Sequence, residues 1–508
     1  MPGFLSTIIS SAVDSRLGRS FGFLSLAQAV TALTNFGIIT LFTQRLHPEE
    51  FGKISISWLF VVVMSTLIDC RLNTAFSVKY YKSDDRERSA GVYSILLFNL
   101  LLWGVVSSLI IGLPHLVPAL LKFQVSGTDL QIICLLIMFM VIGNFYSSYL
   151  IVSRQSCRYF LVMVLFNGLL VFGSLLFLLG ADHGYRAYLE AYLAAYVVIS
   201  CIGLLYLVRV YPPRSGQWFS RGFLLELLKI SAPLIPDGLT LMLLTWTGRY
   251  VLNLSDGLTA VGIYSVAFSF SNIFNNFIVT PFGQAIFPVA AERFVRSRDE
   301  YVRLMQQIFK YYWVVILGVI LIYSVVLQDV YRIFIGKKYF ESYPVVFLLL
   351  TGTMFWGAAS LLSVTVIMKE KTGQLFKISV ISAAVNVTLC LLLVPYLGMY
   401  GAAIAIVVGY AFQFLAILAF TQRLVRVVYD YAFVARSVFQ TTLFIGCILW
   451  ISLSNVPYLL GTGLKLLVSV GYALFAYRTY NLRDNLLVLA GDIGKRPAGN
   501  QADSGDEP

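Results

Sequence analysis

The sequence predicts an all-α membrane protein with about 14 transmembrane helices. Three observations lead to this fold class: a composition that is 58% hydrophobic and only 12% charged, apolar runs that recur along the chain, and basic residues sorted between alternate loops. A soluble globular protein carries about 25% charged residues. The composition therefore excludes a soluble enzyme, a disordered chain and a disulfide-rich scaffold.

The apolar runs are each long enough to span most of a hydrocarbon core of about 30 Å. The expected spans cover residues 21–43, 52–76, 91–112, 130–152, 160–180, 187–208, 230–250, 262–290, 311–327, 344–368, 378–394, 400–420, 437–453 and 466–480. The eighth span contains Pro281 and Pro288, so we expect it to kink or to end early.

The basic residues give the expected orientation. The segments on the side of the N-terminus carry 27 Lys and Arg, the opposite loops carry 9, and Arg71 lies within the second span. Cytoplasmic loops of membrane proteins are enriched in Lys and Arg. The sequence therefore predicts a multi-pass protein with both termini in the cytoplasm.

The two ends of the chain have compositions of their own. Residues 1–20 carry apolar side chains at helical spacing, which predicts an interfacial amphipathic helix. Residues 481–508 are polar and rich in Gly and charge, which predicts a disordered cytoplasmic tail.

The sequence contains no motif typical of a metal, cofactor or nucleotide-binding site. The six cysteines form no CxxC pair, the three histidines are far apart, and no GxxxxGK[ST] loop occurs. The loops are too short for a catalytic domain. We therefore expect no catalytic residues, no metal, no cofactor and no nucleic-acid partner.

Two stretches look like copies of each other. Phe51-Gly52-Lys53-Ile54-Ser55 opens the second span, and Val261-Gly262-Ile263-Tyr264-Ser265 opens the eighth. Six spans separate the copies, so both would have the same orientation in the membrane. This predicts parallel repeats around an axis normal to the bilayer.

Polar residues recur on single faces of several spans. The stripes comprise Asn272, Asn276, Thr280 and Gln284 in span eight, Gln28, Thr31 and Asn35 in span one, and Ser379, Ser382 and Asn386 in span eleven. An amide that faces lipid leaves its donors and acceptors unpaired. These faces either bind neighbouring helices or line a watery cavity, and we favour the cavity because stripes recur in corresponding helices.

Four ionisable residues lie in or beside spans. They are Asp69, Arg71, Asp237 and Arg249. Such residues are expected to be functional. Three of them also have a structural interpretation: the two arginines as groups that reach the membrane interface, and Asp237 as a hydrogen-bonding partner of a neighbouring helix.

Several segments resemble one family. They are Leu46-His47-Pro48-Glu49-Glu50-Phe51-Gly52, Val261-Gly262-Ile263-Tyr264-Ser265-Val266-Ala267, Ile335-Gly336-Lys337-Lys338-Tyr339-Phe340-Glu341-Ser342-Tyr343-Pro344, and Val385-Asn386-Val387-Thr388-Leu389 with Pro395-Tyr396-Leu397-Gly398-Met399-Tyr400-Gly401-Ala402-Ala403. The chain thereby resembles the polysaccharide flippases, of the O-antigen and exopolysaccharide type, within the multidrug/oligosaccharidyl-lipid/polysaccharide exporter superfamily.

The resemblance implies two six-helix lobes around a central cavity, followed by a helix pair. The expected parts are an N-lobe at 21–210, a cytoplasmic linker at 211–229, a C-lobe at 230–424 and spans 13 and 14 at 425–480. The protein would lie in the bacterial inner membrane and move an undecaprenyl-diphosphate-linked oligosaccharide from the cytoplasmic to the periplasmic leaflet by alternating access. Expected partners are this substrate, membrane lipid, a polysaccharide polymerase and the chain-length machinery.

Within this interpretation the polar residues acquire expected roles. Arg71 and Arg249 would hold the diphosphate, because Arg offers a fixed fork of donors to phosphate oxygens. The cavity residues that would contact sugars or line the path are Gln28, Asn35, Asn272, Asn276, Gln284 and Asn386. Asp69 and Asp237 are the candidates for ion coupling. Two alternatives stay open: a drug or ion exporter of the same superfamily, and a multi-span glycosyltransferase or polymerase.

Overall fold

The computed structural model describes residues 16–454, except 82, 114, 181–182 and 213–218, and then residues 461, 463–465 and 467–472. The expected amphipathic helix therefore lies largely outside the described residues, and so does the expected tail. Within these ranges the chain is helical and contains no strand. The helices are α2 (Arg16–Arg45), α3 (Pro48–Asp69), α4 (Leu72–Tyr80), α5 (Asp85–Gly112), α6 (Leu116–Leu121), α7 (Gly127–Val152), α8 (Ser156–Leu175), η1 (Leu176–Gly180), α9 (Arg186–Val210), α10 (Arg221–Ser231), α11 (Leu234–Ser255), α12 (Gly257–Phe274), η2 (Asn275–Val279), α13 (Thr280–Arg296), α14 (Arg298–Phe334), η3 (Lys337–Ser342), α15 (Tyr343–Met368), α16 (Thr372–Leu424) and α17 (Tyr431–Leu453).

Eleven helices of the described chain are long and apolar enough to cross a membrane, or 12 if the bent pair α10 and α11 forms one span. This count treats the 53-residue α16 as one helix, although Gly398 interrupts it with φ 53° and ψ −131°. Glycine adopts this backbone without the penalty that a Cβ would bring. The break separates the predicted spans eleven and twelve. The all-helical membrane fold is thus confirmed, whereas the number 14 stays a prediction because residues 473–480 lie outside the described part.

The chain divides into two compact units. The smaller unit includes residues 313–327 of α14 and the chain from Tyr431 onward. Its described core contains Leu321, Val325, Ile448 and Tyr472. The Thr441 and Tyr472 hydroxyls lie 2.9 Å apart within it. These contacts join the middle of α14 to α17 and to the described helical residues 463–465 and 467–472.

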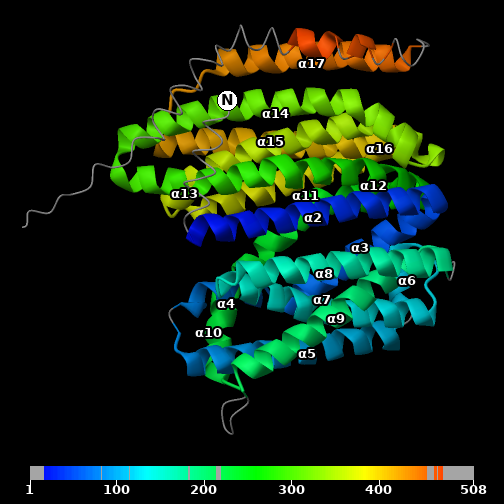
Figure 1. Cartoon of the computed structure of the whole chain (residues 1–508), viewed down its shortest axis with the longest axis vertical. Coiled ribbons are helices and arrows are strands. Elements are labelled where there is room, and N and C mark those ends of the chain that lie inside the picture. The colour runs from blue at the N-terminus through cyan, green and yellow to red at the C-terminus, as the bar shows by residue number, and fades with distance from the viewer. Residues whose placement is uncertain are drawn as a thin grey trace, which may run out of the picture. The chain divides into compact units, whose positions relative to one another are not determined.

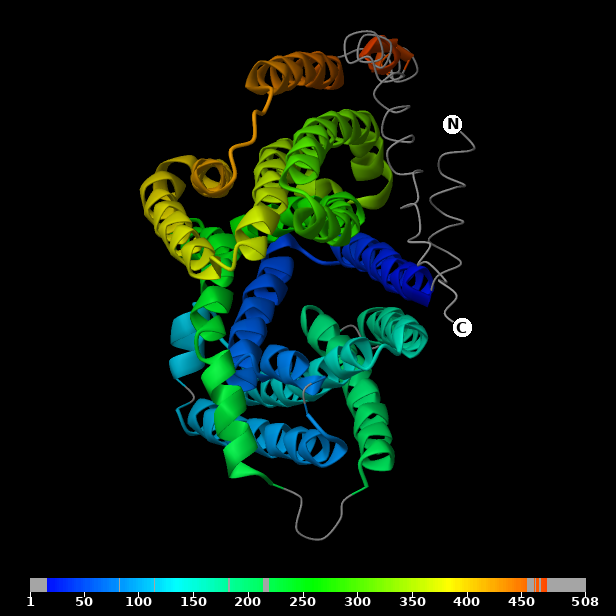
Figure 2. The same cartoon turned by 90° about the vertical axis from the view of Figure 1, so that its left-hand side faces the viewer.

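The larger unit comprises residues 19–312 and 328–430 and contains two groups of helices. In the first group α7 packs against α3, α5 and α9, and α8 packs against α9. In the second group α16 packs against α11 and α15, and α15 packs against α12. The groups are separated in Figures 1 and 2, and α3 joins them by packing along α12.

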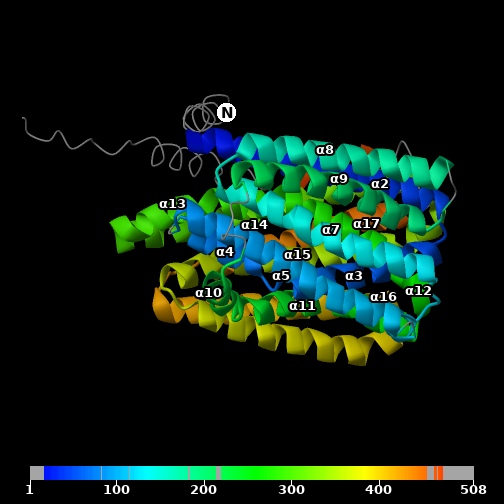
Figure 3. The same ribbon diagram turned by 90° about the horizontal axis from the view of Figure 1, so that it is seen from below.

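Loops that are expected to share one side of the membrane do come together. Lys79 of α4 forms an ion pair with Glu226 of α10, and the Tyr81 hydroxyl donates to the carbonyl oxygen of Val152. Figures 1 and 3 show α4, α10 and α13 toward one end of the helices, and Figure 1 shows α6 toward the other. The chain segment at 211–229, expected as a linker, contains most of α10, which packs on α4 and α5.

The expected second span, 52–76, is interrupted. Cys70 and Arg71 have left-handed backbones with φ 47° and 56°, so α3 ends at Asp69 and the short α4 begins at Leu72. The left-handed region is unfavourable for residues with a Cβ, and it persists only where tertiary contacts enforce it. The apolar pattern of this segment gave no sign of the break.

Candidate functional site

One end of the larger unit is closed by glycines at equivalent positions of the two repeated stretches. A Cβ at Gly52 would overlap the carbonyl oxygen of Leu258, and a Cβ at Gly262 would overlap that of Pro48. The N-terminal ends of α3 and α12 therefore approach each other more closely than any larger residue permits. Such contacts between small residues are the usual way in which membrane helices associate tightly. We call this region the closed end.

A second set of contacts at the closed end comes from the segment before α15. A Cβ at Gly336 would overlap the carbonyl oxygen of Thr43, and the Tyr339 hydroxyl donates to the carbonyl oxygen of Leu46 over 3.2 Å. The ring of Tyr339 also lies 5.9 Å from that of Phe51. Three of the four segments that carry the family resemblance thus meet at this end.

A cavity of about 280 Å³, here called the central cavity, lies between helices of the two groups. It is lined by Asn35, Ile38 and Ile39 of α2, Phe51, Ile54, Ser55 and Trp58 of α3, Tyr188 and Tyr192 of α9, Trp246 and Arg249 of α11, and Ser265, Ser269, Asn272, Ile273 and Asn276 of α12 and η2. Among these described lining residues, only Arg249 carries a charge. Amides, hydroxyls and aromatic rings form most of the remaining wall.

Arg249 is a buried cation with unused donors. It is 4% exposed, and its Nε and Nη1 atoms are buried without a hydrogen-bond partner in the described structure. The guanidinium carbon lies 3.9 Å from the ring centroid of Phe268 and 4.3 Å from that of Trp246. Aromatic faces attract cations and hold this group in place, but they provide no acceptors for its N–H groups.

An aromatic wall, formed by Trp58, Tyr188 and Tyr192, lines another part of the same cavity. The ring centroids of Trp58 and Tyr192 lie 4.4 Å apart, and those of Tyr188 and Tyr192 lie 4.6 Å apart. Phe42 packs edge-on against Tyr188 at 5.5 Å. Sequence reasoning missed these rings, although Tyr188, Tyr192 and Tyr196 recur every four residues in span six.

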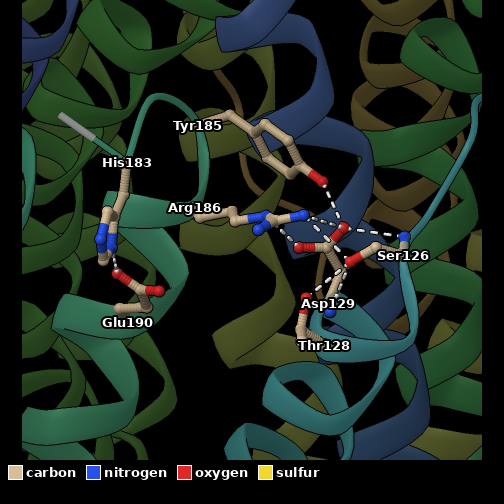
Figure 4. A network of polar contacts seen from close by, with 7 residues as sticks. All are labelled: Ser126, Thr128, Asp129, His183, Tyr185, Arg186 and Glu190. Atoms are coloured by element: carbon tan, nitrogen blue, oxygen red, sulfur yellow. Dashed lines mark hydrogen bonds and ion pairs between the residues drawn. The ribbon is translucent and has the colours of Figure 1, made fainter.

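A polar network holds the start of α9, two residues before Tyr188 (Figure 4). Arg186 Nε lies 2.6 Å from Oδ1 of Asp129, whose side chain is 2% exposed. The Tyr185 hydroxyl donates to Asp129 Oδ2 over 2.8 Å, and Arg186 also donates to the Ser126 hydroxyl over 2.9 Å. Burial and the hydrogen bond to Asp129 raise the pKa of Tyr185 to about 12, so its hydroxyl remains a donor. The network fixes α9 to α7.

Arg71 borders two further cavities. One, of about 300 Å³, is also lined by Gly238, Thr245, Asn272 and Asn275, and we call it the second cavity. A Cβ at Gly238 would overlap the Arg71 guanidinium, so this side chain lies directly against the backbone of α11. Its Nε is buried without a hydrogen-bond partner. Asn272 lines both the central and the second cavity.

The third cavity, of about 250 Å³, lies between α3, α4 and α7. Asp69 and Arg71 line it together with Ser65, Thr66, Asn73, Thr74, Val141, Asn144 and Ser148. The Asp69 Oδ1 and Asn73 Oδ1 atoms are buried and lack a hydrogen-bond partner among the described residues. This cavity is therefore rich in oxygen atoms and carries one carboxylate.

The structure brings together some of the predicted site residues and separates others. Asn35, Arg249, Asn272 and Asn276 line the central cavity. Asn386 is 1% exposed and packs between Gly409 and Cys390 within α16, and Gln28 borders none of the three cavities. The side chains of Asp237 and Gln284 lie outside the described residues. The interpretation of Arg249 as an interface anchor does not fit its burial.

The polar stripe of span eight is interrupted as well. The π-helical turn η2 covers Asn275–Val279, just before Pro281. A π turn takes about one residue more than an α turn. The turn therefore changes the rotation of the residues after it, such as Thr280, relative to a regular α-helix, and the single face expected for the whole stripe stays a prediction.

Comparison with solved structures identifies the fold. The lipid II flippase MurJ in an inward closed conformation superposes with a TM-score of 0.69 at 15% identity, over 90% of this chain and 99% of that one. A multidrug resistance MATE family transporter of the MOP superfamily superposes in its inward-facing conformation with a TM-score of 0.64 at 14% identity, over 78% of this chain and 94% of that one. The outward-facing conformation of such a transporter superposes with a TM-score of 0.59 at 14% identity, over 82% of this chain and 97% of that one.

Sequence comparison identifies the family. No curated protein sequence matches the chain. The family model described as polysaccharide biosynthesis protein matches residues 17–294, which is more than half of the chain. The chain therefore belongs to this polysaccharide biosynthesis family and is a multi-pass membrane protein with the fold of MOP superfamily transporters.

Proposed function

We propose that the protein is a flippase that carries an undecaprenyl-diphosphate-linked oligosaccharide from the cytoplasmic to the periplasmic leaflet. The observation that carries this proposal is Arg249, a buried guanidinium with two unpartnered nitrogen atoms at the wall of a cavity that also holds three asparagine amides. The family membership and the likeness to a lipid II flippase support it. The glycan would serve a cell-surface polysaccharide such as an O-antigen or exopolysaccharide.

The unpartnered donors explain why an anion suits this cavity. A buried charge without a partner destabilises the folded protein. Removal of the partner of a buried Arg lowers the stability by several kcal/mol. Phosphate oxygens would supply the missing acceptors, and each charge-assisted hydrogen bond contributes about 1.5–3 kcal/mol. Arg71, with its own buried Nε at the second cavity, is the second proposed diphosphate ligand.

The closed end supports alternating access. We assign this end to the periplasm, because α3 begins after the first expected outer loop and the basic loops are expected on the opposite side. At this end, glycines of each helix group contact backbone carbonyl oxygens of the other group. The two groups can therefore separate there without breaking a covalent or buried ionic bond. The fold is known in both inward-facing and outward-facing conformations of another transporter. The N-lobe at 21–210 and the C-lobe at 230–424 are the proposed moving parts.

A drug or ion exporter is one competing function, since MATE transporters share the fold. A buried Arg249 disfavours cationic drugs at the central cavity, where the described lining residues include no Asp or Glu. A glycosyltransferase or polymerase would need a constellation of acidic or basic catalytic groups. The described residues of the central cavity do not contain one.

The energy source is proposed to be an ion gradient coupled through Asp69. Its buried, unpartnered Oδ1 faces a cavity that also contains the oxygen atoms of Asn73 and several hydroxyl groups. Carboxylates inside membrane proteins commonly take up protons or small cations. Asp237 remains the second candidate.

The direct test measures transport by the purified protein in liposomes. An undecaprenyl-diphosphate-linked trisaccharide with a fluorescent label should cross the bilayer at a rate that depends on the protein, and a cationic dye should not. Transport of the dye alone would contradict the flippase and support the exporter. Elongation or cleavage of the trisaccharide would support the transferase.

A polysaccharide polymerase and the chain-length machinery are the proposed partners downstream.

A further inference from the structure

We infer that the aromatic wall of Trp58, Tyr188 and Tyr192 binds the sugar bonded directly to the diphosphate, while Arg249 holds the phosphates. The inference rests on the proposed function and deepens it, because it assigns an orientation to the substrate within the central cavity. The sugar would lie toward α3 and α9, and the diphosphate toward α11. All four side chains line this cavity.

The wall is a rigid, prepared surface. Trp58 contacts both tyrosines, with centroid distances of 4.4 Å to Tyr192 and 5.8 Å to Tyr188. Tyr192 is only 8% exposed, and Phe42 supports Tyr188 from behind. The network of Asp129, Tyr185 and Arg186 fixes the first turn of α9. A ligand would therefore bind without having to order these rings.

A sugar ring needs two kinds of contact at once. Its C–H face is apolar and packs on aromatic rings, whereas its hydroxyl groups both donate and accept hydrogen bonds. An asparagine amide can also do both. Asn35, Asn272 and Asn276 line the same cavity as the aromatic wall. A purely apolar ligand, such as the prenyl chain, would leave these amides without partners.

The repeat places two aromatic rings at equivalent positions but gives them different neighbours. Trp58 lies three residues after Ser55, and Phe268 lies three residues after Ser265, so the two rings occupy equivalent positions of the repeated stretches. Trp58 belongs to the aromatic wall, whereas Phe268 lies beneath the Arg249 guanidinium. Equivalent positions thus face a sugar on one side and a cation on the other.

The size of the cavity limits what it holds. Its volume of about 280 Å³ is near the lower end, ~300 Å³, of cavities that bind small molecules. A diphosphate with one sugar is closer to this size than a whole oligosaccharide is. The remaining sugars would have to lie beyond it, so the first sugar is the one that the wall can select.

Binding measurements with three short lipids test this orientation. The probes are farnesyl diphosphate and the same lipid carrying one glucose or one N-acetylglucosamine on the diphosphate. The full-length protein in nanodiscs should bind at least one glycosylated probe more tightly than the bare diphosphate. Tyr192→Leu and Trp58→Leu should each reduce that affinity about tenfold, the equivalent of ~1.4 kcal/mol, and change the affinity for farnesyl diphosphate less than twofold.

Two further variants separate the possible failures. Tyr196→Leu is the matched control, because Tyr196 lies one turn along α9 and packs at a tilt against Phe166, at a centroid distance of 4.8 Å, without lining the central cavity. It should leave all affinities unchanged. Arg249→Ala should weaken every probe alike. If Tyr192→Leu weakens bare and glycosylated lipids equally, or weakens neither, the sugar site is overturned. If the unmodified protein binds none of the probes, the proposed function itself fails.

Discussion

The hydroxyl oxygens of Ser55 and Ser265 lie 2.6 Å apart, although 210 residues separate them in the chain. Each occupies the same position in its repeated stretch, three residues after Gly52 or Gly262. Pro48 and Leu258, whose carbonyl oxygens face these glycines, are equivalent in the same way. A residue that meets its own equivalent is the sign of a twofold relation. The pair therefore lies where the axis relating the two repeats crosses the closed end.

A disulfide between these two positions should lock the closed end. We expect Ser55→Cys with Ser265→Cys, in a background without the six native cysteines, to form a disulfide on mild oxidation, since the side-chain atoms already touch. Transport in liposomes should stop and return after reduction. Each single substitution is the control and should stay active under both conditions. Undiminished transport by the crosslinked protein would contradict the proposal that the closed end opens during transport.

Substitution by Lys should show whether Arg249 and Arg71 are diphosphate ligands or interface anchors. Arg→Ala at either position should reduce affinity for the lipid diphosphate about 10- to 100-fold, because a charge-assisted contact contributes ~1.5–3 kcal/mol. Arg→Lys should also lose most of this affinity, since Lys lacks the planar fork. Glycan export at matched protein levels provides the second measurement. Full export in both Ala variants would rule these residues out as diphosphate ligands.

Asp69 should couple transport to an ion gradient. In Asp69→Asn we expect gradient-stimulated transport to fall to the unstimulated rate, while binding of the lipid diphosphate is retained. The matched control is Asp85→Asn at the start of α5, where the carboxylate is 88% exposed and borders none of the three cavities. Stimulation that survives in Asp69→Asn would leave Asp237 as the candidate.

The network at the start of α9 should contribute measurably to stability. Asp129→Asn removes the ion pair with Arg186 and weakens the contact to Tyr185, so we expect a loss of about 1–3 kcal/mol and a lower Tm. Glu190→Gln is the control, because its partner His183 is 43% exposed and exposed ion pairs contribute less than ~1 kcal/mol. Equal Tm values for the two variants would show that the network has no such role.

The topology can be checked independently of transport. Reporter fusions at Asp182 and Val456 should report a periplasmic location, and a fusion at Ser297 a cytoplasmic one. The expectation rests on the 27 basic residues of one side against 9 of the other. A periplasmic signal at Ser297, which precedes α14, would overturn the orientation and with it the assignment of the closed end.

The sequence by itself determined the class of the protein and its main elements. Length, apolar runs and the scarcity of charge predicted a helical membrane protein, and short motifs around Gly52 and Gly262 predicted the family. It also identified Arg249, Asn35, Asn272 and Asn276 as candidate cavity residues, and all four line the central cavity. Composition and spacing suffice for these because lipid imposes helices on any spanning segment and penalises every unpaired polar group.

Only the tertiary structure decided which polar faces meet. Asn386 and Asn272 both lie on polar stripes, yet one packs inside α16 and the other borders two cavities. The break at Cys70 and Arg71 and the π-helical turn at Asn275 had no distinct signal in the apolar pattern, and the four-residue spacing of the α9 tyrosines did not show that they meet Trp58. Helical periodicity defines the face on which a residue lies. Whether that face meets lipid, another helix or a cavity depends on which other parts of the chain pack against it.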